Sequence, residues 1–146
     1  MRKDVMFMAT TAQWVYDRAI HLMDEQSEAG GQTCTEDTRE YRLRTLSILN
    51  ILRHELFPLS DTYRLLGCRR PVCPELTDFD QEIGLDDPVA QGILPYGLAA
   101  HLLLGENNPL ANYFSQRYLE LMAQLRASLP ARWESIAPAY GRLDVS

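Results

Sequence analysis

The chain of 146 residues has only one lysine, Lys3, and no apolar run of the length that a membrane span needs. Its most apolar segment, residues 89–104, is interrupted by Pro95 and Gly97. The apolar stretch near the N-terminus is too short for the hydrophobic region of a secretory signal. These absences predict a protein that is made and kept in a cytoplasm, without a membrane partner.

Cysteine is also scarce, and the three residues present, Cys34, Cys68 and Cys73, form an odd number. Without an export signal we expect free thiols, although the spacing of Cys68 and Cys73 leaves a small disulfide loop open. No standard zinc-ligand spacing occurs, and the histidines fall on different expected helices. The sequence therefore predicts neither a metal site nor a cofactor.

Catalytic motifs are missing as well. The chain has no Gly-x-Ser-x-Gly elbow, no phosphate-binding loop and no Gly-x-Gly-x-x-Gly. Asp86 and Asp87 are adjacent, but we expect Asp87 to cap a helix before Pro88 rather than to serve as an acid or base. We therefore expect a protein that is not an enzyme. An enzyme, or a metal-dependent helical protein, that uses His54, His101 and the acidic residues of 78–87 is the alternative.

A net charge of −6 argues against nucleic acid as the main partner. Arginines gather locally, however, within residues 39–44 and again within residues 64–70. We interpret both groups as solvated surfaces. A phosphate-binding patch, as in a small DNA-binding or packaging-associated helical protein, remains the alternative function.

Apolar residues at helical spacing predict a first helix over about residues 10–25, starting at Thr10 or Thr11, and a long second helix over about 36–57. The main apolar side of the long helix contains Tyr41, Ile48, Leu49, Leu52 and Leu56, and this side is widened by Leu43, Leu46 and Ile51. Such a helix either packs on two sides, or packs on one side and meets a partner on the other.

Residues 58–86 lose this periodicity and predict a long structured loop, which is our first candidate for a partner-binding surface. A helical hairpin is expected over about 88–129, with Asp87 and Asn108 as N-caps before prolines and Gly105 at the turn. Pro95 is expected to bend its first arm, and Gly97 to let helices approach closely. Aromatic residues of the tail, 130–146, are expected to dock it on the bundle.

Together these segments predict one all-α domain over residues 1–146: a compact bundle of about four main helices, with a long irregular loop between the second and third. The nearly all-apolar arm at 89–104 predicts a helix that is buried against several neighbours.

Three stretches of the hairpin resemble the small helical head–tail connector, or adaptor, proteins of tailed phages and prophages. They are Leu-Asp-Asp-Pro at 85–88, Gly-Ile-Leu-Pro-Tyr-Gly-Leu-Ala-Ala at 92–100, and Ala-Asn-Tyr-Phe-Ser-Gln-Arg-Tyr at 111–118. The resemblance implies a structural virion protein that joins the portal protein to tail-completion proteins as a ring on the portal. It implies assembly in the host cytoplasm and a final place in the virion neck, without catalysis.

The residues that we expect to contact partners come from the loop and from the bent helix. They are Arg64, Arg69, Arg70, Phe79 and Tyr96.

Overall fold

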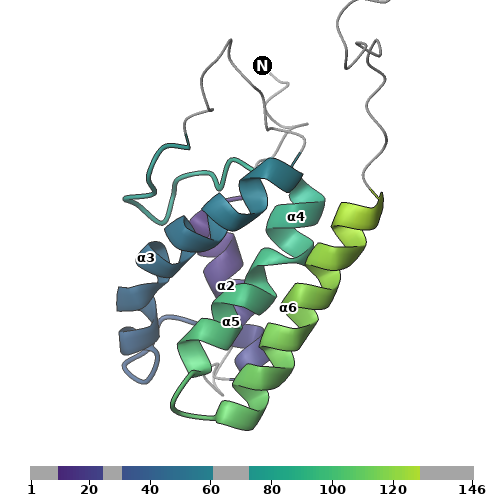
Figure 1. Cartoon of the computed structure of the whole chain (residues 1–146). Coiled ribbons are helices and arrows are strands. Elements are labelled where there is room, and N and C mark those ends of the chain that lie inside the picture. The colour runs from purple at the N-terminus through teal and green to yellow at the C-terminus, as the bar shows by residue number, and fades with distance from the viewer. Residues whose placement is uncertain (1–9, 25–30, 61–72, 129–146) are drawn as a thin grey trace, which may run out of the picture.

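The computed structural model describes residues 10–24, 31–60 and 73–128. Within them the chain forms the helices α2 (Ala12–Met23), α3 (Arg39–Leu56), α4 (Asp87–Gly92), α5 (Leu94–Leu103) and α6 (Asn108–Ser128), with a 3-10 turn at Phe57–Leu59. The main helices alternate in direction, and α3 and α6 lie on opposite sides of the molecule (Figure 1). The predicted all-α bundle, with its long loop between the second and third main helices, is confirmed.

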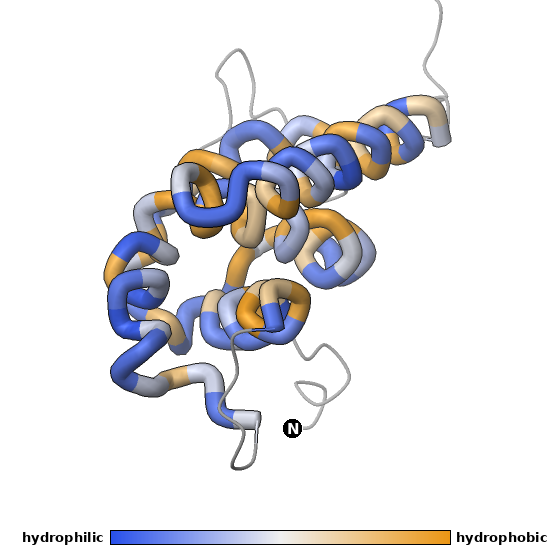
Figure 2. Tube along the Cα trace, turned by 90° about the horizontal axis from the view of Figure 1, so that it is seen from below, coloured by the Kyte–Doolittle hydropathy of each residue, from blue (hydrophilic) through white to orange (hydrophobic). Residues whose placement is uncertain are grey.

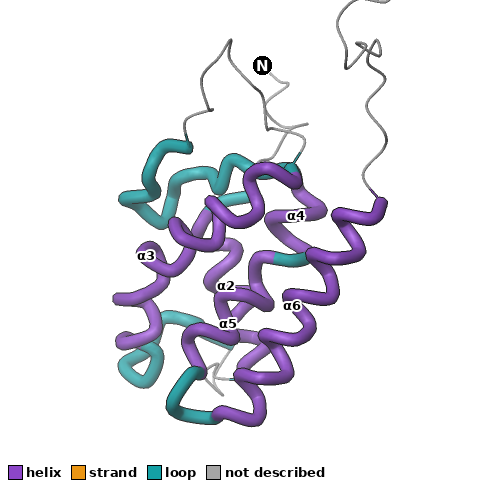
Figure 3. The backbone as a smooth tube through the Cα atoms, viewed as in Figure 1, coloured by secondary structure: helices purple, strands orange, loops and turns teal. Residues whose placement is uncertain are grey.

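Helix α5 lies at the centre of this bundle and contacts α2, α3, α4 and α6. Most of its side chains are buried, including Leu94, Leu98 and Leu102, which have no exposed surface. This arrangement explains why the sequence of α5 is apolar on nearly every side. The hydrophobic stretches of the other helices turn toward the middle of the molecule, and the hydrophilic stretches turn outward (Figure 2). Loops and turns join the helices of the described residues (Figure 3).

The first arm of the predicted hairpin is two helices rather than one bent helix. Helix α4 ends at Gly92, Ile93 has φ −119° and ψ −46°, and α5 begins at Leu94 with a proline in its first turn. Because Pro95 has no N–H and its ring crowds the carbonyl four residues earlier, the helix stops and restarts. The turn after α5 contains Gly105 at φ +92°, as the expected left-handed position requires.

Both predicted N-caps are wrong by one residue. Asp86 holds the cap position of α4, while the Asp87 carboxylate accepts a 2.9 Å hydrogen bond from the Thr10 hydroxyl. At α6 the backbone N–H of Leu110 donates to Asn107 Oδ1 at 3.2 Å, so Asn107 is the cap instead of Asn108. In each case the proline is the second helical residue, where its missing N–H costs no hydrogen bond.

Candidate protein-interaction surfaces

Residues 73–86, the described part of the predicted docking loop, are fastened to α3 by two side chains. Asn50 forms a paired contact with Leu76, whose N–H donates at 2.7 Å and whose carbonyl accepts at 3.1 Å. The buried Arg53 donates to the carbonyls of Ile83 at 2.8 Å and Pro74 at 2.7 Å. These contacts hold the backbone of the loop against the C-terminal half of α3.

The same loop also completes the start of α2. The backbone N–H groups of Ala12 and Gln13 donate to the carbonyls of Gln81 and Phe79, each at 2.9 Å. These are first-turn N–H groups, which have no partner within their own helix. An isolated antiparallel bridge pairs Thr11 with Glu82, so the loop is part of the folded core structure.

Phe79, a predicted partner-binding residue of this loop, is half-buried against neighbours in the chain. The Arg42 guanidinium carbon lies 3.8 Å from the centre of the Phe79 ring, and the Tyr16 ring meets Phe79 edge-on at 5.7 Å. Burial raises the pKa of the Tyr16 phenol. Phe79 therefore joins the loop to α2 and α3.

Tyr96, another predicted partner residue, is half-buried on α5, with its ring centre 6.1 Å from that of Phe114 on α6.

One residue further, a Cβ on Gly97 would lie 2.8 Å from Tyr118 Cε1 and 3.1 Å from Leu52 Cδ1. The prediction that Gly97 permits close helix approach is confirmed. The Tyr118 hydroxyl donates to Glu55 at 2.8 Å, and burial together with that carboxylate raises the pKa of the phenol.

The expected basic surface at residues 39–44 is not one continuous face. Arg42 lies over Phe79 and donates to Cys34 Sγ at 3.2 Å, whereas Arg44 donates to the Leu102 carbonyl at 3.1 Å. The other predicted arginines, Arg64, Arg69 and Arg70, lie outside the described residues, as does the tail at 130–146.

Helix α3 exposes two large apolar side chains that the sequence pattern grouped with the main apolar side of the helix. Leu43 is 71% exposed and Ile51 is 61% exposed, with the exposed Ser47 midway between them. We call these three residues the α3 stripe. Their spacing of four residues places them on one face of the helix, between the exposed side chains of Glu40 and His54. The polar residues Glu40 and His54 on the same face were the sequence signal that could have indicated the exposure of Leu43 and Ile51.

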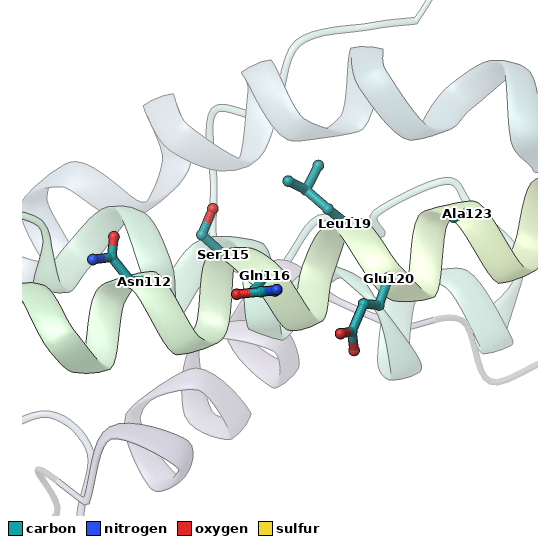
Figure 4. A pocket seen from close by; sticks show the side chains of 6 residues that line it. All are labelled: Asn112, Ser115, Gln116, Leu119, Glu120 and Ala123. Carbon is teal, nitrogen blue, oxygen red and sulfur yellow. The ribbon is translucent and has the colours of Figure 1, made fainter.

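A second exposed surface follows α6. A shallow groove there is lined by Asn112, Ser115, Gln116, Leu119, Glu120 and Ala123. Leu119, which is 59% exposed, and Ser115 project from one side of the helix, and Glu120 projects from the other (Figure 4). A small hollow of about 120 Å³ continues it toward Leu104 at the end of α5.

Among the described residues, no group of three or more His, Cys, Asp or Glu side chains is placed to hold a metal ion. Cys34 and Cys73 are free thiols, and Cys68 lies outside the described residues. In the part of the chain that the structure describes, no helix is both long and apolar enough to span a membrane.

The chain was compared with protein-family models, curated proteins and solved structures, and none of them matches it.

Proposed function

We propose that this protein is a structural subunit that works by binding other proteins. The observation that carries the proposal is the α3 stripe, in which two large apolar side chains stay exposed on an 18-residue helix. Exposed apolar side chains that lie on one helix face and are framed by polar residues can form the apolar centre of a protein interface. The opposite side of α3 is anchored in the core by Leu49, Leu52 and Leu56, so the stripe has a rigid support.

Within this class, we infer that the protein is a head–tail connector subunit of a tailed phage or prophage. The resemblance of the stretches at 85–88, 92–100 and 111–118 to connector proteins supports this inference. In the proposed role the subunit joins the portal protein to tail-completion proteins, assembling in the host cytoplasm and remaining in the virion neck. A ring of identical subunits needs two different patches on each copy, because its contacts are head-to-tail. The α3 stripe supplies one of these patches.

The test replaces the two apolar residues of the α3 stripe through Leu43→Glu and Ile51→Glu. The variant is supplied to a phage or prophage whose own gene for this protein has been deleted. Both side chains are exposed, so the variant should fold with an unchanged circular dichroism spectrum. Placing two charges in an apolar interface should lower its incorporation into particles by more than about tenfold.

The matched control adds the same charge to another helix through Gln124→Glu and Ala127→Glu, two exposed positions of α6. It should be incorporated like the unmodified protein. Normal incorporation of the α3 variant, or an equal loss in the control, would contradict the assignment of the interface to the α3 stripe.

A further inference from the structure

The α3 stripe and its polar neighbours are arranged symmetrically about Ser47. Leu43 and Ile51 each lie four residues from Ser47, one on either side. Glu40 and His54 each lie seven residues from it, again one on either side. All five side chains are exposed, and at the pitch of an α-helix they fall within about 40° of Ser47 around the helix axis. The face therefore matches an inverted copy of itself, with an apolar residue and then a titratable one toward each end.

Helix α3 presents this face to the outside of the bundle. Leu49, Leu52 and Leu56, on the other side of the helix, are buried in the core. Helix α6 lies on the opposite side of the molecule (Figure 1). A second molecule can thus reach the stripe while the packing of the described helices stays as it is.

We propose that the α3 stripe of the free subunit is covered by the same stripe of a second copy, with the two α3 helices antiparallel and a two-fold axis at Ser47. The inference rests on the proposed function, because it names a partner for the same surface. A two-fold contact uses one patch on both copies, so a single helix face is sufficient. In the assembled particle the ring contact replaces this contact between free copies.

The antiparallel register gives each residue of the face a suitable partner. Leu43 of one copy lies at the same height as Ile51 of the second copy, so the exposed apolar side chains cover each other. Glu40 lies at the same height as His54 of the second copy, which pairs a carboxylate with an imidazole that can donate a hydrogen bond. A parallel pairing would instead place the two Glu40 carboxylates side by side, where like charges repel.

Cysteine pairing tests the position of the two-fold axis. Ser47→Cys and Leu43→Cys are introduced separately in a background where Cys34, Cys68 and Cys73 are serine. Helices packed at about 8–10 Å bring the two copies of residue 47 within disulfide range, whereas the two copies of residue 43 are eight residues, or about 12 Å, apart along the helices. Under limiting oxidant, disulfide-linked dimers should form at least about tenfold faster from Ser47→Cys. Equal rates, or faster linkage of Leu43→Cys, would overturn the proposal.

Analytical ultracentrifugation of the full chain tests the dimer itself. An interface of one helix from each copy is small, so a dissociation constant of about 1–100 µM is expected. Ser47→Glu and Ser47→Arg each place two like charges at the axis and should raise that constant at least about tenfold. Ser47 is exposed, so both variants should keep the circular dichroism spectrum of the unmodified protein.

The two charge variants also test the symmetry of the contact when they are mixed. An equimolar mixture of Ser47→Glu and Ser47→Arg should form dimers again, because opposite charges then meet at the axis. The matched control, Gln124→Glu on the exposed side of α6, should dimerise like the unmodified chain.

The outcomes separate this proposal from the head–tail role. An unmodified chain that stays monomeric up to about 1 mM, or a mixture that does not recover dimers, would overturn the dimer. Neither result bears on the incorporation of the subunit into particles. A dimer in solution together with absence from particles would contradict the head–tail role and support the dimer.

Discussion

Replacing Arg53 by leucine is expected to lower the free energy of unfolding by about 3 kcal/mol, because buried acceptors lose their donor. The guanidinium is buried and bonds to Ile83 and Pro74, which are carbonyl acceptors, and to the Asn50 side chain at 3.1 Å. Leucine fills part of the space but donates no hydrogen bond. The loss should fall first on residues 73–86, which Arg53 joins to α3.

Urea denaturation followed by circular dichroism gives the free-energy change, and amide hydrogen exchange locates it. The N–H groups of Ala12, Gln13 and Ile83 form the backbone hydrogen bonds between the loop and the start of α2. Their hydrogen exchange should therefore accelerate more than that of the amides in the α5 core. Arg39→Leu, an exposed position at the start of the same helix, is the matched control and should change stability by less than about 0.5 kcal/mol. Unchanged protection of these three amides in Arg53→Leu would refute the role assigned to Arg53.

The second large effect is expected from Gly97→Ala. A Cβ at this position would meet the Tyr118 ring at 2.8 and 2.9 Å, and that ring is held by the hydrogen bond from its hydroxyl to Glu55. Overpacking of this kind costs about 1–3 kcal/mol, which exceeds the gain of up to about 1 kcal/mol from replacing glycine by alanine in a helix. Net destabilisation of about 1–2 kcal/mol is therefore expected.

Gly92→Ala provides a control of opposite sign. No atom lies within 4 Å of a Cβ built at Gly92, so alanine there should stabilise the protein by about 0.5 kcal/mol. Thermal and urea denaturation of the two variants should thus move in opposite directions. If both variants were at least as stable as the unmodified chain, the close packing of α3, α5 and α6 at Gly97 would not hold.

The helices were predictable because their information is local. Apolar spacing and caps place α2 within about 10–25 and α3 within about 36–57, and the observed helices lie inside those ranges. The choice between Asp86 and Asp87 as the cap was not local. It depends on Thr10, which is 77 residues away and engages Asp87.

The surfaces were harder to predict because exposure depends on which helices pack together. Leucine and isoleucine look alike in a pattern whether they are covered or open, so Leu43 and Ile51 were placed with the buried side. Arginine is seldom buried, so the sequence did not indicate that Arg53 would anchor the loop. The alternative in which the long helix keeps one open side agrees with the observed exposure of α3.

The measurement that tests the proposed function most directly is quantitative mass spectrometry of purified phage particles. The particles are produced by inducing the phage or prophage that encodes the protein. A head–tail connector subunit should be present in intact particles at the copy number expected for a ring on the portal, in a fixed ratio to the portal protein. The copy number should be the same in separate preparations. Absence of the protein from intact, infectious particles would contradict the account.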